Sequence, residues 1–378
     1  MVVYLIIFFF SVFALILNNI LTKENEKMII EIVILIILCL ISGTRYKLGG
    51  TDYFIYEKMF DVVPTLGDFN FDTVHGIYGT FGAEKGYLYL NSIVKSLGFN
   101  FYGFTLLHSM FFYFSLYKGL KKYTNNFNLL IIVFLYKMFF YNTFISLRQS
   151  ITIGIFFLAM HYIQEKKIVK YFMMCFIATL FHKGALILFF IYFINKIQLT
   201  KKILIKINIF FIPTIVLSVI NFPILKYFNF IVTFLSDPTL ADKTSRLVNE
   251  GYSSSIGIFH TLEYFFVMFL VIHFFEQITS LDKNAEFILK LFVILLPLFT
   301  LFRGYEILTR FKDYFILTYP IILGYLCLID EKRMRTILQF GIVSICLLGF
   351  IRYLVLFDGG ALMPYSSYLF KGISIFAK

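Results

Sequence analysis

The sequence lacks the motifs by which proteins bind nucleotides and divalent metal ions. It contains no Walker motif, no glycine-rich dinucleotide pattern and no pair of aspartates spaced for a divalent cation. None of the short lysine-bearing stretches between its apolar runs is long enough to fold as a soluble catalytic domain. These absences argue against ATP-driven transport and against nucleotide-sugar chemistry at the inner face of a membrane. They predict no cofactor and no metal ion.

Cysteine is also scarce, and its placement excludes two structural roles. All four cysteines lie inside apolar runs without the spacing of metal ligands: Cys39, Cys175, Cys327 and Cys346. We interpret them as small core residues and predict neither a disulfide framework nor a zinc site. Charged residues make up only 15% of the chain, and the net charge of +12 comes mostly from lysines between apolar runs. Membrane topology explains these lysines, so we expect no binding of nucleic acid.

Apolar residues dominate the composition. Hydrophobic residues make up 60% of the chain and the mean hydropathy is +0.83, whereas soluble domains average about 45–50% apolar residues. Many apolar runs approach the roughly 20 residues that a helix needs to cross a bilayer. They predict about twelve spans, at 2–21, 28–43, 101–117, 127–144, 147–163, 168–181, 184–195, 203–221, 257–275, 285–302, 311–329 and 336–354. The predicted fold class is therefore an all-α, polytopic membrane helical bundle that forms one integral membrane domain over residues 1–378.

The basic residues of the short loops predict how the chain is oriented. With this set of spans, the lysine clusters all fall on one side, which the positive-inside rule assigns to the cytoplasm. The long loops 44–100 and 222–256 and the C-terminal tail then face outward, and the weakly apolar end after Phe357 is a candidate re-entrant segment. Six of the eight arginines lie near this outer face, against the usual bias: Arg45, Arg148, Arg246, Arg303, Arg310 and Arg352. Because a planar guanidinium group suits two-point binding of phosphate or carboxylate, these positions predict an anion-binding site.

Within the outward loop 44–100, turn residues single out two acids. Asp52 follows a Gly-Gly-Thr turn, and Glu84 lies two residues before a glycine. Tyr87 and other aromatic residues of this loop suit stacking on sugar rings, but they equally suit an aromatic belt at the membrane interface. We interpret the remaining acids of the loop as solvated charges.

Three further polar groups fall at the outer ends of apolar runs. Arg148 and Gln149 begin the fifth run and supply donors suited to an oxyanion or a sugar, with snorkelling of Arg148 to lipid headgroups as the alternative. His182 lies at an expected break between two short helices, an arrangement that often lines polar sites, with an ordinary outer turn as the alternative. Arg303 and Arg310 alternate with acids at helical spacing, which predicts an anion site or a self-paired structural ladder that faces the bundle interior.

Five short motifs follow one another along the chain. They are Arg45…Gly50-Thr51-Asp52…Tyr56, Glu84-x-Gly86-Tyr87-x-x-Leu90-Asn91, Leu147-Arg148-Gln149-Ser150, Phe181-His182-Lys183 and Pro364-Tyr365. In this order they resemble the EpsG family, within the Wzy-type O-antigen and exopolysaccharide polymerases, over nearly the whole chain. The resemblance implies a glycosyltransferase of the bacterial inner membrane with its active site facing the periplasm or exterior. Such an enzyme joins oligosaccharide repeat units carried on undecaprenyl pyrophosphate. The implied partners are these lipid-linked glycans, membrane lipids and a chain-length regulator.

This chemistry predicts roles for the candidate residues. Negative charge develops on the pyrophosphate as the glycosidic bond breaks, and preorganised arginines stabilise such charge. The candidates are Arg148, Arg303 and Arg310, with Arg45 nearby. Gln149, Tyr87 and Tyr365 are predicted to add further substrate contacts. The acceptor hydroxyl needs a base within hydrogen-bond reach, for which the candidates are His182, Asp52 and Glu84. His182 is favoured because imidazole titrates near neutral pH.

Two other functions are compatible with the sequence. An O-antigen ligase would use the same donor with lipid A core as the acceptor, and its chemistry at the arginines would be alike. A flippase or exporter of lipid-linked sugars would need charged residues along a path through the membrane, whereas the ionisable residues here cluster toward the outer side. A non-catalytic scaffold would give no reason for the outward arginines.

Overall fold

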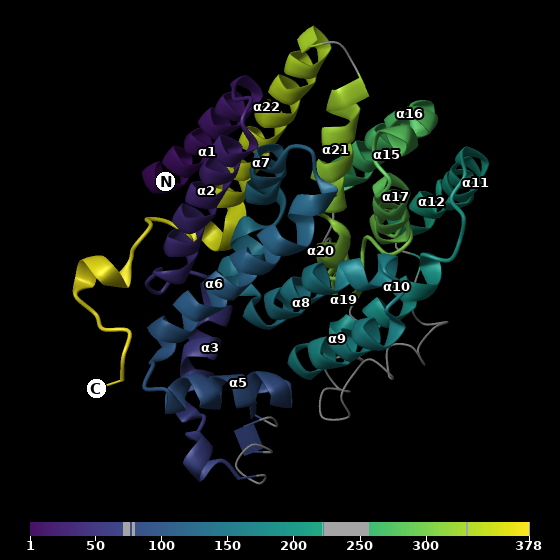
Figure 1. Cartoon of the computed structure of the whole chain (residues 1–378). Coiled ribbons are helices and arrows are strands. Elements are labelled where there is room, and N and C mark those ends of the chain that lie inside the picture. Colours follow the sequence, from purple (N-terminus) through teal and green to yellow (C-terminus); the bar gives the residue numbers. More distant parts are fainter. Residues whose placement is uncertain (71–75, 78–79, 221, 223–256, 330–331, 378) are drawn as a thin grey trace. The chain divides into compact units, whose positions relative to one another are not determined.

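The structure is a computed structural model that describes the chain except for residues 71–75, 78–79, 221, 223–256, 330–331 and 378 (Figure 1). Every regular element in the described ranges is a helix, and the only pairings between extended segments are two isolated bridges. The predicted all-α class is confirmed. The chain divides into two compact units, which we call unit 1 (Met1–Ala185 with Lys332–Lys378) and unit 2 (Leu186–Glu331).

The predicted count of about twelve membrane spans is not confirmed. In the described part of the chain, four helices are long and apolar enough to cross a membrane: Val2–Ile20, Lys201–Val219, Lys312–Ile329 and Arg335–Leu356. A fifth candidate is the pair Ile258–His273 and Phe275–Leu281, which is bent by 79°. Several other apolar blocks form helices that are too short to qualify, such as Phe127–Lys137 and Ile168–Phe181. The chain is a helical membrane protein, with fewer uninterrupted long helices than the apolar runs suggest.

Unit 1 contains the loop that follows Gly43 and the helices around it. Its elements in chain order are α1 (Val2–Ile20), α2 (Glu24–Gly43), α3 (Gly50–Val62), η1 (Leu66–Asp68), α5 (Lys85–Ser96), α6 (Phe101–Leu120), η2 (Lys121–Tyr123), α7 (Phe127–Lys137), η3 (Tyr141–Ile145), α8 (Leu147–Gln164), α9 (Ile168–Phe181), the start of η4 (Lys183–Ile187), α22 (Lys332–Leu356), η7 (Phe357–Gly360) and η8 (Tyr368–Lys371). Helix α6 packs against both α2 and α8, and α9 packs on α8. The approach of α6 to α8 is close, because a Cβ at Gly119 would lie 2.6 Å from the Phe157 backbone.

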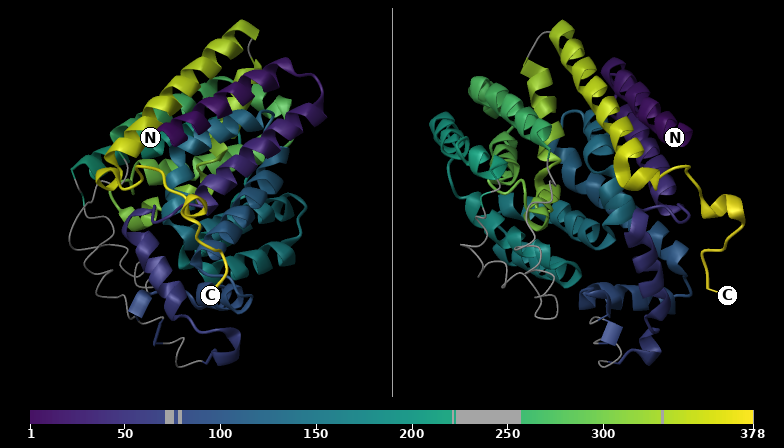
Figure 2. Two further views of the ribbon diagram at one scale, coloured as in Figure 1. Left: turned by 90° about the vertical axis from the view of Figure 1, so that its left-hand side faces the viewer. Right: turned by 180° about the vertical axis from the view of Figure 1, so that it is seen from behind.

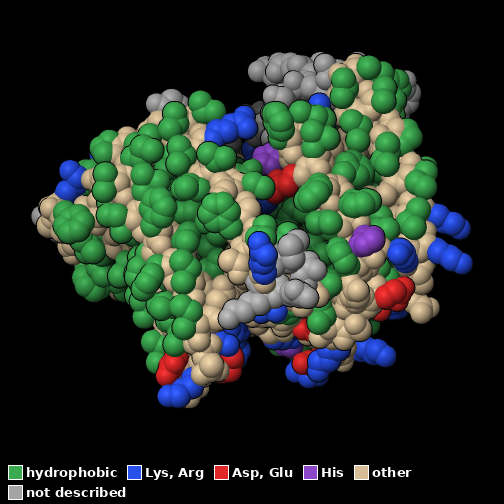
Figure 3. Space-filling view, turned by 90° about the horizontal axis from the view of Figure 1, so that it is seen from above, with side chains coloured by type: hydrophobic (Ala, Val, Ile, Leu, Met, Phe, Trp, Pro, Cys, Tyr) green, Lys and Arg blue, Asp and Glu red, His purple; other side chains and the backbone are tan. Residues whose placement is uncertain are grey.

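The outer helices of unit 1 present apolar side chains. Helices α1 and α22 run side by side in both views of Figure 2, joined by a 2.7 Å hydrogen bond from Asn19 to Gln339 and by packing of Phe8 on Phe350. On the outer side of α22, Phe340 is 74% exposed. Hydrophobic side chains are also numerous on the face seen in Figure 3, where they lie among charged and other side chains. Large exposed apolar surfaces are unfavourable in water, so these faces suit contact with lipid.

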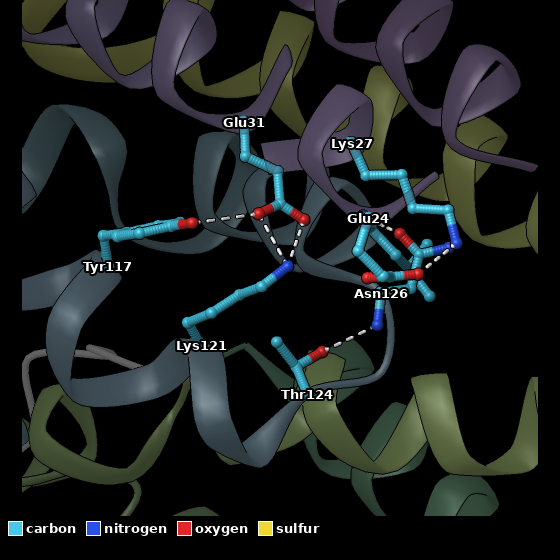
Figure 4. Close-up of polar contacts among 8 residues, drawn as sticks. Glu24, Lys27, Glu31, Tyr117, Lys121, Thr124 and Asn126 are labelled. Carbon is cyan, nitrogen blue, oxygen red and sulfur yellow. Dashed lines mark hydrogen bonds and ion pairs between the residues drawn. The ribbon is translucent and has the colours of Figure 1, made fainter. Parts of the chain in front are cut away.

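An ion pair with a buried carboxylate ties two helices of unit 1 together. Glu31 on α2 is 1% exposed, and its carboxylate accepts hydrogen bonds from Lys121 Nζ at 2.6 Å and from the Tyr117 hydroxyl at 3.4 Å (Figure 4). A buried carboxylate without a partner would be strongly destabilising. Lys121 supplies the compensating charge and so links α2 to the end of α6.

The chain after α22 returns to the loop. We call residues 357–377 the C-terminal strap. Its helices are the short η7 and η8, and it contains no helix long enough to re-enter the membrane. The Tyr46 backbone N–H donates to the Ser366 carbonyl at 2.9 Å, and the Asn100 N–H donates to the Ile375 carbonyl at 3.0 Å. The strap therefore contacts the start of the loop and the start of α6.

Unit 2 is also helical. Its elements are the end of η4, α10 (Leu188–Ile194), α11 (Lys201–Phe211), α12 (Thr214–Val219), α15 (Ile258–His273), α16 (Phe275–Leu281), α17 (Ala285–Val293), α18 (Leu295–Phe299), α19 (Glu306–Thr309), α20 (Lys312–Phe315) and α21 (Thr318–Ile329). Aromatic packing fills its core, where the Tyr264 ring lies 4.8 Å from that of Phe292 and 5.6 Å from that of Phe299. Of the predicted outward loop 222–256, residues 223–256 and the candidate Arg246 lie outside the described residues.

Candidate functional site

Arg148 and Glu84 form an ion pair in unit 1. Arg148 stands in the first turn of α8, and its Nη1 donates to Glu84 Oε2 at 2.6 Å and to the Gly82 carbonyl at 2.9 Å. Its Nε lies 3.5 Å from the Tyr56 hydroxyl on α3. No acceptor for the remaining nitrogen, Nη2, is found among the described residues. Because the side chain is 23% exposed, Nη2 is available to an anionic ligand.

Glu84 also contacts the end of α9. Its Oε1 accepts a hydrogen bond from the Lys183 backbone N–H at 3.0 Å. The predicted helix break is confirmed here, since α9 ends at Phe181 and η4 begins at Lys183. One carboxylate thus contacts both α8 and the break after α9, which brings Arg148 and His182 to one place.

His182 is half-buried at this break, and its hydrogen bonding decides what its ring can do. Its Nδ1 accepts the backbone N–H of Gly184 at 3.1 Å. The neutral ring therefore carries its proton on Nε2, where it acts as a donor. In this conformation His182 suits hydrogen bonding to an anion better than removal of a proton. Its role as the general base stays a prediction.

Tyr87 and Gln149 belong to the packing around the ion pair. The Tyr87 ring is fully buried and meets the Tyr56 ring edge to face, with 5.7 Å between centroids. Gln149 is buried as well, and its Oε1 accepts a hydrogen bond from the Ser146 hydroxyl at 3.3 Å. Tyr87 thus packs on a neighbour of Arg148, and Gln149 contacts the residue that precedes α8. Their predicted contacts with substrate stay predictions.

His108 on α6 is a residue of this site that the sequence analysis missed. Its Nε2 lies 2.7 Å from the Ser150 hydroxyl oxygen, and that hydroxyl donates to the Leu147 carbonyl at 2.8 Å. These bonds tie the first turn of α8, which carries Arg148, to α6. A histidine inside an apolar run was the available signal, because ionisable residues at membrane depth are commonly functional.

Arg45 is fully buried at the end of α2. Its guanidinium group donates to the carbonyls of Ser42, Leu48 and Phe144, at 2.5, 3.1 and 3.3 Å. Burial lowers the pKa of Arg45 to about 10, which leaves the side chain charged at neutral pH. Its donors are used by the protein itself, so Arg45 organises the start of the loop in this conformation. Its predicted contact with substrate stays a prediction.

Tyr365 and Asp52 make no direct contact with the Arg148–Glu84 ion pair. The Tyr365 hydroxyl, on the C-terminal strap, donates to the Ile41 carbonyl at 3.1 Å and lies 3.3 Å from the Thr44 hydroxyl. Asp52 stands in the first turn of α3, one helical turn before Tyr56, and is exposed. Its carboxylate has no ion pair or hydrogen bond to another described residue. Within the described ranges, no three His, Cys, Asp or Glu side chains gather in a way that could hold a metal ion.

Arg303 and Arg310 belong to unit 2. The Nε of Arg303 donates to the Ser218 hydroxyl at 2.9 Å, and Arg310 is exposed. The continuous helix that would align their charges does not form. Residues 301–304 are turns, α19 covers only four residues, and α20 begins at Lys312. The charged ladder expected from the sequence is therefore broken into short segments.

An apolar cavity of about 360 Å³ lies beside the ion pair in unit 1. Helices α5, α6, α8 and α9 line it, with side chains that include Leu90, Phe104, Phe111, Ile151, Ile177 and Phe181. Phe181 directly precedes His182, and Ile151 lies about one turn after Arg148. A charged cluster at the helix ends is thus followed by an apolar cavity between the helices.

These features define a helical membrane protein with a charged site at the ends of its helices. A family model matches residues 28–367, and the chain belongs to the EpsG family. This family is associated with polysaccharide polymerase activity in exopolysaccharide and O-antigen biosynthesis. No curated protein and no solved structure matches the chain.

Proposed function

We propose that this protein is a glycosyltransferase that polymerises oligosaccharide repeat units carried on undecaprenyl pyrophosphate into O-antigen, capsule or exopolysaccharide. The growing glycan leaves its lipid pyrophosphate and is joined to the next lipid-linked unit. The reaction takes place at the outer face of the bacterial inner membrane, toward which the lysine distribution directs the loop 44–100. Membership of the EpsG family supports the polymerase class.

The neighbouring charged cluster and apolar cavity carry this proposal. Arg148 offers Nη2 at the start of α8, where the helix dipole also favours an anion. The cavity that begins at Phe181 and Ile151 offers about 360 Å³ of apolar space. A pyrophosphate attached to an isoprenoid chain combines an anionic head with an apolar tail. Its two parts match the two parts of this site.

The transfer requires charge stabilisation at the leaving group. By direct displacement, the bond from the anomeric carbon to pyrophosphate breaks while a bond to the acceptor oxygen forms, which inverts the anomeric centre. Arg148 Nη2 and His182 Nε2–H stabilise the charge that develops on the pyrophosphate. Glu84 and Gly82 hold the guanidinium group in place, so little reorganisation is needed during the reaction. Arg303 and Arg310 stay predicted anion-binding groups of unit 2.

The acceptor hydroxyl loses its proton to a base. Both oxygens of Glu84 accept hydrogen bonds, and Nδ1 of His182 accepts the Gly184 N–H. The exposed Asp52 carboxylate accepts none from the described residues. Asp52 also lies one helical turn before Tyr56, whose hydroxyl is 3.5 Å from Arg148 Nε, so we infer that Asp52 is the base. Asp52→Asn should lower the rate at least about 100-fold, since general base catalysis is worth about 10²–10⁴-fold. Substrate binding should persist, and the conservative Asp52→Glu should regain part of the rate.

The function is tested in a strain that lacks this protein. The strain is complemented with wild type, Arg148→Lys, His182→Ala or a control variant, and its surface polysaccharide is compared on gels. The control is Arg352→Lys, since Arg352 is an exposed outward arginine of α22 that makes no hydrogen bond or ion pair with the residues of the Arg148 site. Lysine cannot reproduce the fork of Arg148, and loss of one such donor lowers rates about 10²–10³-fold. We expect long chains from wild type and Arg352→Lys, and single repeat units from the two site variants, at equal amounts of protein in membranes.

Other outcomes separate the alternatives. If the deletion abolishes even single repeat units attached to their acceptor, such as lipid A core, the function is ligation or export and not polymerisation. If the deletion stops polymerisation while both site variants behave as wild type, the assignment of the site is wrong although the function holds.

A further inference from the structure

Two lysines from distant parts of the chain converge on one tyrosine ring at the surface of unit 1. Lys47 Nζ lies 5.5 Å and Lys371 Nζ lies 4.8 Å from the centroid of the Tyr46 ring. Both distances fall within the roughly 6 Å over which a ring face attracts a cation. Lys47 follows α2, whereas Lys371 ends η8 on the C-terminal strap, and both lysines are exposed.

The backbone builds this convergence. The strap is joined to Tyr46 by the hydrogen bond to Ser366 described above, and Tyr46 stacks on Tyr102 of α6 with centroids 5.9 Å apart. Lys47 has φ of +53°, in the left-handed region that residues with a side chain rarely adopt. Rare backbone conformations persist where the surrounding structure fixes them, and they are frequent at ligand sites. The backbone segments that carry the two lysines are therefore joined by main-chain contacts beside the Tyr46 ring.

The charge of this place is only partly offset by the protein. In the described part of the chain, neither lysine has a carboxylate within ion-pair distance. The nearby Glu57 accepts a hydrogen bond from the Tyr102 hydroxyl at 3.4 Å. Burial raises the pKa of Glu57, whereas the charge of Lys47 lowers it, so Glu57 and Lys47 interact without an ion-pair contact. Two cations held near one ring repel each other, and an anion between them relieves that repulsion.

The side chains next to Lys371 indicate the source of the anion. Phe370 is 90% exposed and Leu369 is 57% exposed, so two large apolar groups precede the lysine at the surface. The strap follows α22, whose segment Arg335–Leu356 is long and apolar enough to span a membrane. Apolar side chains that enter the membrane interface beside lysines at headgroup depth fit a lipid that carries phosphate.

We propose that Lys47, Tyr46 and Lys371 form a binding site for the phosphate group of a lipid, separate from the site at Arg148. The lipid is an anionic phospholipid of the bilayer or a polyprenyl phosphate, which share a phosphate on an apolar tail. When bound, it contacts both the loop start and the C-terminal strap, and so holds the strap over the buried Arg45. This inference does not depend on the polymerase function.

The test measures thermal unfolding of the purified full chain in detergent with a thiol-reactive dye, which reports exposure of the buried Cys175, Cys327 and Cys346. The additives are phosphatidylglycerol, undecaprenyl phosphate, sodium phosphate, and phosphatidylcholine, whose choline cation offsets its phosphate. The variant is Lys47→Gln with Lys371→Gln. The matched control is Lys122→Gln, because the exposed Lys122 also lies over a tyrosine ring, 4.8 Å from the centroid of Tyr123.

We expect an anionic lipid to raise the unfolding midpoint of wild type and of the Lys122 control. The double variant should lose at least half of that shift, and Lys47→Arg with Lys371→Arg should keep it. A shift from phosphatidylglycerol assigns the site to bilayer lipid, and a shift from undecaprenyl phosphate alone assigns it to the carrier lipid. The proposal fails if phosphatidylcholine acts equally, if sodium phosphate alone gives the full shift, or if the double variant responds as wild type does.

Discussion

At the scale of single residues, two arginines of unit 1 occupy opposite situations. The guanidinium group of Arg45 is buried and donates to carbonyls from the end of α2, from the following loop and from η3. Arg148 is partly exposed and keeps Nη2 without an acceptor in the described structure. The same fork of donors therefore joins three backbone segments by hydrogen bonds at Arg45 and is available to a ligand at Arg148. Substitution should affect stability at the first and activity at the second.

We expect Arg45→Gln to destabilise the protein. A shorter neutral side chain cannot reach all three carbonyls, and each buried acceptor left unsatisfied costs about 1–3 kcal/mol. The midpoint in the thiol-dye unfolding assay should fall clearly for Arg45→Gln, and it should stay near that of wild type for Arg148→Lys and for Arg352→Gln. Equal midpoints for Arg45→Gln and wild type would instead return Arg45 to the set of substrate-binding candidates.

At the scale of helices, the site depends on how closely α5 approaches α9. A Cβ at Gly86 in α5 would lie 2.6 Å from the Leu180 carbonyl oxygen, so only glycine permits this contact. Glu84 stands immediately before α5, and its hydrogen bond to the Lys183 N–H crosses the same contact. The spacing Glu84-x-Gly86 thus joins a charged site residue to the packing that positions it.

Gly86→Ala should push α5 away from α9 and weaken the link between Glu84 and the break after α9. Such overpacking costs about 1–3 kcal/mol, and displacement of a site by about 1 Å can lower a rate about 100-fold. The control is Gly341→Ala on α22, where a new Cβ meets no atom within 4 Å. Polymerised glycan should fall at least about tenfold for Gly86→Ala and not for Gly341→Ala. Unchanged product from Gly86→Ala would show that this contact does not position the site.

The features that could be predicted from sequence are those that local pattern determines. The run 168–195 suits neither one straight span nor two comfortable ones, which predicted the break at His182, and Arg148 was expected at a helix start. Burial of Arg45 depends on Phe144, about 100 residues away, and no local pattern contains that contact. The hydrogen bond of His108 to Ser150 is likewise nonlocal. The span count exceeded the helices found because hydropathy measures composition, whereas short breaks such as η3 depend on packing.

At the scale of the whole molecule, the proposed chemistry depends on the side of the membrane on which the loop 44–100 of unit 1 lies. The charged site contains Glu84 from this loop and Arg148 from the start of α8, whereas Lys121 and Lys122 lie at the opposite end of α6 from the loop. Helix α6 corresponds to a span predicted from the sequence, although it is not among the helices found long and apolar enough to cross a membrane. If it crosses the bilayer, its two ends lie on opposite sides. The positive-inside rule then places the lysine end in the cytoplasm and the charged site outside.

Cysteine labelling tests this orientation directly. Three native cysteines are buried, and the partly exposed Cys39 can be replaced by alanine so that no accessible native thiol remains to react. Lys58→Cys, at an exposed position of α3, should react with a membrane-impermeant maleimide in intact spheroplasts. Lys122→Cys, exposed at the other end of α6, should react only after permeabilisation. The opposite pattern would place Arg148 and Glu84 in the cytoplasm, where the outward glycan transfer proposed above could not occur.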